Sequence, residues 1–251
     1  MSYYDYSNQP RGFMAGTPAV RNLLIINIIL YAAIAFGGSA LDSFMLYYPA
    51  SEHFRFWQPV TYMFLHGGFA HLFFNMYSLW LFGAVVEQIL GTRRFLVLYF
   101  VAGIGAALIH TGVGLLQYTA EFNTYVEKLA AINPAVGVEE IRAFAHETFV
   151  DSYLAPWGVE AICPPTVGAS GAIYGLMMAF AMLNPRAEMM LIFPPVRLTA
   201  KWMVIIFGGI ELLTGVLGTT DGIAHFAHLG GMLFAFFLVK YWQHNLYRSN
   251  W

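Results

Sequence analysis

The sequence predicts an all-α membrane protein of six transmembrane helices, with a long outer loop between the third and the fourth helix. Hydrophobic residues make up 59% of its 251 residues, whereas charged residues make up only 10%. Soluble domains carry about 25% charged residues, so this composition excludes an ordinary water-soluble fold. Six separate stretches are apolar enough to cross a bilayer, since each span needs roughly 20 mainly apolar residues.

The six predicted spans form one domain over residues 21–243. A polar tail over 1–20 precedes it and lacks the basic and apolar regions of a signal peptide. A short C-terminal tail over 244–251 follows it. The spans are predicted over 21–41, 68–90, 94–116, 167–184, 201–218 and 224–243.

The segment 117–166 differs in character from the spans around it. It is rich in acidic residues and prolines, and charged groups are costly inside a membrane. We therefore expect an extracytoplasmic insertion. Within it, residues 138–154 have the spacing of an amphipathic helix that rests on the membrane surface or on the bundle. The apolar residues on one side of that helix are Ile141, Phe144, Ala145 and Phe149.

The basic residues predict how the spans are oriented. With six spans, both termini lie on the same side of the membrane. The loop between the second and third spans and the loop between the fourth and fifth spans lie on that side too. Lys and Arg accumulate on the cytoplasmic side of membrane proteins. We therefore expect a multi-pass protein of the plasma (inner) membrane with both termini in the cytoplasm. The basic residues on that side are Arg11, Arg21, Arg93, Arg94, Arg186, Arg197, Lys201, Lys240 and Arg248, against Arg55, Lys128 and Arg142 on the other.

Composition also limits the partners and cofactors of the chain. A net charge of −2 argues against nucleic acid, which requires a basic patch. The single cysteine, Cys163, excludes an internal disulfide framework and a multi-cysteine zinc site. We therefore expect the lipid bilayer as a partner, and no cofactor or metal. The sequence does not predict an oligomeric state.

A serine at the head of the fourth predicted span stands between glycines. Ser170 lies in Gly168-Ala169-Ser170-Gly171, and flanking glycines let another backbone approach its hydroxyl closely. Gly171 and Gly175 form a small-residue face, and the last span offers a matching face with His228, Gly231 and Ala235. A histidine beside a serine can take its proton and make it a nucleophile. Alternatively, Ser170 is a small residue of a helix interface.

A second polar pair lies in the second predicted span. His71 and Asn75 are four residues apart and share one helix face. Both side chains can donate hydrogen bonds, as an oxyanion site requires. Taken alone, they fit an interhelical hydrogen bond better. His66 precedes them and fits the aqueous boundary.

Three blocks of this sequence resemble the signature motifs of rhomboid proteases, in the same order and on the corresponding spans. They are YMFLHGGFAHLFFNMYSLWLFG (62–83), GASGAIYG (168–175) and AHLGG (227–231). The resemblance covers roughly residues 55–243. It implies a six-helix rhomboid bundle and an intramembrane serine endopeptidase that cleaves transmembrane-helix substrates near the outer membrane face. Its partners would be single-span membrane proteins.

The resemblance also implies the roles of individual residues. Ser170 corresponds to the nucleophile and His228 to the base of a Ser–His dyad that works without an acid. The oxyanion pair corresponds to His71 and Asn75. The supporting residues correspond to His66 as the leading histidine, Gly168 of the GxSG block, and Tyr174, which stacks on the base. Glu87 resembles the structural glutamate at the cytoplasmic end of the second span.

Some residues depart from this pattern or stay outside it. Many family members carry an arginine where this chain has Gln58, so the anchoring of the first loop is an open question. Glu211 and Asp221 are the only acids near the dyad, and the resemblance gives neither a catalytic role. We expect Glu211 to be a paired structural group or a gate residue. His225 is secondary, because it lies off the Gly231 face.

Two other functions fit parts of the sequence. A non-catalytic rhomboid-like protein would keep the fold and bind transmembrane helices without cutting them, although an intact Ser170 and His228 argue against it. A polytopic metal or proton transporter would use the histidines as ligands, although few intramembrane acids are present to complete a metal site. The histidines in question are His66, His71, His225 and His228.

Overall fold

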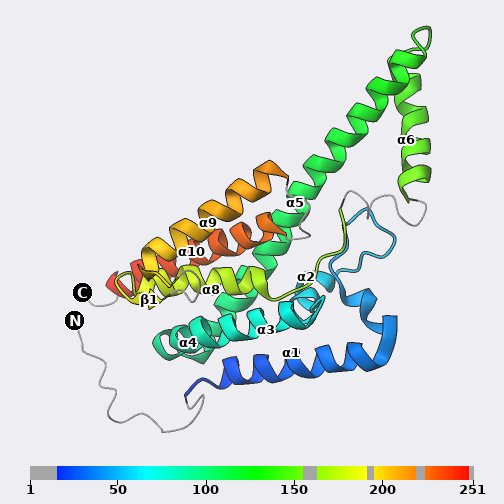
Figure 1. Cartoon of the computed structure of the whole chain (residues 1–251). Coiled ribbons are helices and arrows are strands. Elements are labelled where there is room, and N and C mark those ends of the chain that lie inside the picture. Colours follow the sequence, from blue (N-terminus) through cyan, green and yellow to red (C-terminus); the bar gives the residue numbers. More distant parts are fainter. Residues whose placement is uncertain (1–15, 155–162, 191–194, 219–223, 249–251) are drawn as a thin grey trace.

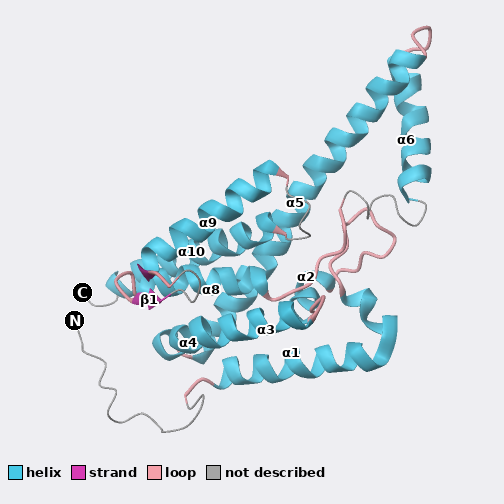
Figure 2. Ribbon diagram, viewed as in Figure 1, coloured by secondary structure: helices cyan, strands magenta, loops and turns pink. Residues whose placement is uncertain are grey.

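The computed structural model of this chain describes residues 16–154, 163–190, 195–218 and 224–248, and these are almost entirely helical (Figures 1 and 2). A short antiparallel hairpin pairs β1 (Glu188–Met190) with β2 (Arg197–Thr199). The helical segments are α1 (Pro18–Gly37), η2 (Gly38–Phe44), α2 (Gln58–Thr61), η3 (Tyr62–Phe64), α3 (Phe69–Ser78), η4 (Leu79–Gly83), α4 (Ala84–Leu90), α5 (Thr92–Ile132), α6 (Val138–Leu154), α8 (Ser170–Leu183), α9 (Ala200–Leu217) and α10 (His225–Arg248).

Each predicted span overlaps a helical segment. The second predicted span consists of α3, η4 and α4 together. Three segments are long and apolar enough to cross a membrane, namely Phe69–Leu90, Thr92–Ile132 and Ala200–Leu217. Pro18–Ile34 and Ser170–Leu183 are shorter apolar helices. The chain is therefore a helical integral membrane protein, and the count of six spans stays a prediction. The N-terminal tail up to residue 15 lies outside the described residues.

Helices α5, α8 and α10 pack against one another in the centre of the bundle (Figure 1). The contact with α10 depends on glycine, because a Cβ on Gly175 would stand 2.9 Å from the carbonyl oxygen of Gly231 and 3.3 Å from the Cβ of Ala235. On the same face of α8, a Cβ on Gly171 would collide with Ala106 of α5. The predicted small-residue faces of the fourth and the last span are thus confirmed.

The buried carboxylate of Glu87 joins three helix ends. It accepts hydrogen bonds from the backbone amides of Ala19 (3.0 Å) and Val20 (2.9 Å), in the first turn of α1. The hydroxyl of Thr92, the first residue of α5, donates to the same carboxylate at 2.8 Å. A negative charge is favourable at a helix N-terminus, so Glu87 caps α1 and fixes it against α4 and α5.

The helix of the third predicted span continues beyond residue 116, because α5 extends to Ile132, into the segment expected as an outer loop. No glycine or proline interrupts the chain between Gln117 and Ile132, and the helix ends before Pro134, which disfavours the helical conformation of its predecessor. A helix of 41 residues is about 60 Å long, roughly twice the hydrocarbon core. The second half of α5 therefore extends beyond the bundle, as Figure 1 shows.

Helix α6 corresponds to the predicted amphipathic helix of the insertion, and it folds back along the extension of α5. A small cluster of Val126, Ile141 and Ala145 is buried between the two helices, and the hydroxyls of Tyr125 and Thr148 lie 3.1 Å apart. Phe144 is 54% exposed, so it does not share the contact that Ile141 and Ala145 make with α5. The side chain of Phe149 lies outside the described residues.

Gln58 anchors the first loop of the chain from a fully buried position. Its side-chain amide donates to the carbonyl oxygens of Ser43 (3.1 Å) and His53 (2.8 Å), and its Oε1 accepts from the amide of Tyr47 (3.2 Å). Arg55 is exposed and donates only to carbonyl oxygens of its own turn. Gln58 thus connects both ends of the loop.

Candidate active site

Ser170 is the first residue of α8, at the end of an extended segment that the first loop holds in place. Thr166 pairs with Leu46 of that loop in an isolated β-bridge with two hydrogen bonds of 2.9 Å. The amide of Gly168 donates to the carbonyl oxygen of Tyr62 at 2.9 Å. Gly168 has a φ of +128°, which L-residues rarely adopt. The chain therefore turns sharply into α8 and places Ser170 at its N-terminus.

The structure brings Ser170 and His228 together, as the sequence predicts. The Nε2 atom of His228 lies 2.8 Å from the Ser170 hydroxyl oxygen, within hydrogen-bonding distance. The two residues come from α8 and α10, 58 positions apart in the chain. They meet because Gly171 and Gly231 allow the two backbones to approach closely just below them.

Tyr174 stacks on the imidazole of His228, one turn after Ser170. The ring centroids are 4.2 Å apart and the planes differ by only 5°. This parallel contact restricts the rotation of the imidazole about its side-chain bonds. It confirms the packing that the sequence predicts for Tyr174.

A glutamate, Glu211, lies directly beside the dyad, although the sequence gives it no catalytic role. The Oε1 atom of Glu211 is 3.0 Å from His228 Nδ1, at the distance of an ion pair, although the angle at Nδ1 falls short of a hydrogen bond. The hydroxyl of Tyr174 donates to the same oxygen. His225 Nδ1 lies 2.6 Å from the other oxygen, Oε2. The expectation that Glu211 is a paired group is confirmed, but one of its partners is His228 itself.

A general signal could have identified Glu211 from the sequence. A buried carboxylate in an apolar span costs several kcal/mol unless it has partners, and such residues commonly mark functional sites. Its partner in the last span was not evident, because a contact between two helices depends on how they dock and not on the periodicity of either one. The other candidate acid, Asp221, lies outside the described residues.

His71 faces the turn that leads into Ser170. A Cβ on Gly168 would stand 2.8 Å from His71 Nε2 and 3.7 Å from the Ser170 hydroxyl oxygen. The imidazole and the hydroxyl therefore lie on the same side of the Gly168 backbone. The Nδ1 atom of His71 accepts a hydrogen bond of 3.4 Å from the amide of Gly67, so that its Nε2 carries the proton and can donate.

His66 and Asn75, the other two polar residues of the block 62–83, are both buried. His66 is only 5% exposed and packs edge-on against His71, with ring centroids 5.2 Å apart. Its expected place at the aqueous boundary is therefore wrong. Asn75 is also buried, and its side-chain amide donates to the backbone carbonyl of His71 at 2.8 Å. The described contacts thus bring His71, but not Asn75, to the turn before Ser170.

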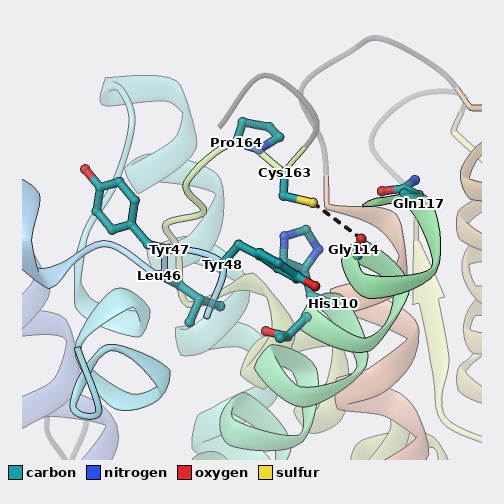
Figure 3. Close-up of a pocket in the computed structure, with 9 residues that line it drawn as sticks. Leu46, Tyr47, Tyr48, His110, Gly114, Gln117, Cys163 and Pro164 are labelled. Atoms are coloured by element: carbon teal, nitrogen blue, oxygen red, sulfur yellow. Dashed lines mark hydrogen bonds between the residues drawn. The ribbon is translucent and has the colours of Figure 1, made fainter. Parts of the chain in front are cut away.

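A small separate cavity of about 50 Å³ lies between the first loop, the middle of α5 and residues 163–164 (Figure 3). The thiol of Cys163 donates to the carbonyl oxygen of Gly114 at 3.5 Å, and His110 bonds the hydroxyl of Thr166 at 2.9 Å. Burial raises the pKa of the Cys163 thiol to about 11. A protonated thiol is a poor nucleophile, which makes Cys163 an unfavourable reactive group.

Comparison with known proteins relates this arrangement to one family. Residues 53–243 match the family described as "Rhomboid domain". "Rhomboid protease GlpG" of Photorhabdus laumondii is 28% identical over 173 residues, which cover 64% of this chain and 60% of that protein. "RHOMBOID-like protein 5" of Arabidopsis thaliana is 29% identical over 182 residues, which cover 72% of this chain and 42% of that protein.

A shorter match reaches a higher identity. "Rhomboid protease GluP" of Bacillus subtilis is 33% identical over 103 residues, which cover 38% of this chain and 20% of that protein. The chain thus spans between a fifth and three fifths of the length of these three relatives. The match over residues 53–243 includes Ser170 and His228. The chain belongs to the Rhomboid domain family.

Proposed function

We propose that this protein is an intramembrane serine endopeptidase that cleaves transmembrane-helix substrates with Ser170 as the nucleophile and His228 as the base. The observation that carries the proposal is the distance of 2.8 Å between His228 Nε2 and the Ser170 hydroxyl oxygen. Two relatives are named rhomboid proteases, which supports the same reaction class.

In the first step, His228 Nε2 takes the hydroxyl proton as Ser170 attacks the carbonyl carbon of a substrate peptide bond. The tetrahedral intermediate collapses when His228 returns this proton to the leaving amine. Water then attacks the acyl-enzyme with His228 again as the base, and the carboxylate product is released. The stacked ring of Tyr174 holds the imidazole in plane during these transfers.

The oxyanion that forms on the substrate carbonyl needs donors that are already in place. The N-terminus of α8 supplies one, because the amide of a first helical residue such as Ser170 has no intrahelical partner, and the helix dipole favours negative charge there. His71 Nε2, on the same side of Gly168, supplies a second. We assign Asn75 a supporting role in which it holds the backbone of His71 through its intrahelical bond.

We propose that a substrate helix approaches the site along α9. Its outer face presents large apolar side chains to the surroundings, and the helix contacts α10 and, to a smaller extent, α8. The exposed residues of this face are Trp202, Ile205, Ile206, Ile210, Leu212, Leu213, Val216 and Leu217. A substrate segment must unwind before its peptide bonds can reach Ser170, so helix-weakening residues such as Gly or Pro are expected near the cleavage site.

The placement of the protein in its membrane follows from its basic residues. The start of α1, the α4–α5 turn and the end of α10 lie at one end of the bundle, with the β1–β2 hairpin (Figure 1). Most Lys and Arg residues belong to these segments. We propose that this end faces the cytoplasm of the plasma (inner) membrane, and that Ser170 opens toward the outer face.

The test is cleavage of a single-span substrate by the purified protein in detergent, with wild type, Ser170→Ala and His228→Ala compared. We expect the wild type to cut in the presence of EDTA, and each variant to lose activity by about 10⁶-fold, below detection. Cleavage by Ser170→Ala would contradict the assignment of the nucleophile. A wild type that binds the substrate without cutting it would favour a non-catalytic helix-binding protein instead.

A further inference from the structure

We infer that Glu211 is the third member of the active site, a positioning residue that acts on Ser170 through His228 and turns the expected dyad into a Ser–His–Glu triad. The inference rests on the proposed function of Ser170 and His228. It adds to that function a group from a third helix, α9.

The distances place the three groups in the order serine, imidazole, carboxylate. Ser170 lies 2.8 Å from one imidazole nitrogen of His228, and Glu211 lies 3.0 Å from the other. A carboxylate at Nδ1 favours the tautomer that carries its proton there, so Nε2 is left free to accept the serine proton. When that proton arrives, the carboxylate stabilises the positive imidazole, and the Nδ1 proton stays on Nδ1.

The surroundings of Glu211 fit a fixed anion. The residue is only 7% exposed, and an unpaired carboxylate at such a depth would be strongly unfavourable. The Tyr174 hydroxyl, His225 and His228 approach its two oxygens. Tyr174 therefore contacts two members of the triad, since its ring stacks on His228 while its hydroxyl orients Glu211.

A purely structural role is the competing explanation. In that case Glu211 would only tie α9 to α10, for which its contact of 2.6 Å with His225 is sufficient. The two explanations predict different effects when Glu211 loses its contact with His228 or its contact with His225. A structural role lowers stability in both cases. A positioning role lowers kcat only when the carboxylate beside His228 is removed.

The experiment measures kcat, KM and Tm for Glu211→Gln, Glu211→Asp and His225→Gln. The uncharged glutamine should lower kcat by about 10²- to 10⁴-fold with KM nearly unchanged. The aspartate should restore part of kcat, because it keeps the charge at a longer distance. His225→Gln should lower Tm while kcat stays far above that of Glu211→Gln. Glu188→Gln makes the same chemical change at an exposed site in β1 and should match the wild type.

A second readout separates this inference from the proposed function. A fluorophosphonate probe labels an activated serine without any peptide substrate, so it reports on Ser170 even if no cleavage is found. We expect the labelling rate of Glu211→Gln to fall in parallel with kcat. Wild-type kcat and labelling in folded Glu211→Gln would overturn the role of Glu211 and leave the dyad intact. If Glu211→Gln does not fold, Glu211→Met decides, because it also lacks the carboxylate, and a wild-type labelling rate in it would likewise overturn the triad.

Discussion

The backbone of Gly231 lies so close to the carbonyl oxygen of Gly171 that a side chain at Gly231 has no room. Gly171 directly follows Ser170 in α8, and Gly231 lies about one turn after His228 in α10. The separation of α8 and α10 at this point therefore sets the distance between the two reactive groups. Packing and chemistry depend on the same pair of glycines.

Gly231→Ala should consequently disable the enzyme without removing any reactive group. The added methyl group must push the helices apart, and overpacking of this kind costs about 1–3 kcal/mol. We expect a lower Tm and a large loss of fluorophosphonate labelling at Ser170. Gly209→Ala is the control, because a Cβ at Gly209 on α9 meets nothing within 4 Å. Wild-type labelling of Gly231→Ala would show that the close approach does not control the dyad.

His71→Ala tests the assignment of the oxyanion donor. Loss of one such donor lowers kcat by about 10²- to 10³-fold, and KM should change little because the donor binds the transition state more strongly than the substrate. Steady-state kinetics with a single-span substrate measures both constants. His53→Ala removes an exposed histidine from the first loop as a control. An effect confined to KM would place His71 in substrate binding instead.

The sequence was sufficient to predict Ser170, His228 and Tyr174 as neighbours, because each lies in a motif whose spacing defines one helix face. It was not sufficient for Glu211. A single acid in an apolar helix has no partner within its own periodic pattern, and its contact with His228 depends on how α9 docks onto α10. The resemblance to rhomboid proteases also implies a dyad without an acid, so it gives no reason to expect Glu211 beside His228.

The length of α5 was missed for a different reason. Hydropathy indicates where a helix leaves the apolar layer, near residue 116, but it does not indicate where the helix ends. The residues beyond that point are polar and still favour helix until Asn133 and Pro134. Similarly, nothing in the local pattern shows that Gln58 is buried, because its three partners lie in other parts of the first loop.

Gln58→Ala should destabilise the first loop. It removes three hydrogen bonds of a fully buried side chain, and a typical bond contributes about 1 kcal/mol. We expect a lower Tm and faster proteolysis after Arg55, measured by limited trypsin digestion. Arg55 itself is exposed, so Arg55→Ala should leave Tm nearly unchanged. Equal stability of Gln58→Ala and wild type would contradict the anchoring role.

Glu87→Gln should loosen the N-terminus of α1. The substitution removes the charge that caps two amides of the first turn, and loss of a cap costs about 0.5–2 kcal/mol. Arg21 lies in this turn and is exposed, so tryptic cleavage there should become faster, while kcat of the intact protein stays unchanged. Glu121→Gln, at an exposed site on α5, is the control. A specific loss of kcat would mean that the α1 contact reaches the active site.

The Cys163 thiol should react slowly with iodoacetamide in the folded protein. Only the thiolate reacts, and burial raises the pKa of this thiol to about 11. At pH 8 the folded protein therefore holds few thiolates, and the rate should rise about tenfold per pH unit until that pKa is reached. In detergent-unfolded chain the thiol should titrate near its ordinary value of about 8.5. Fast alkylation of the folded protein at pH 7.5 would show that the pocket around Cys163 is open to water.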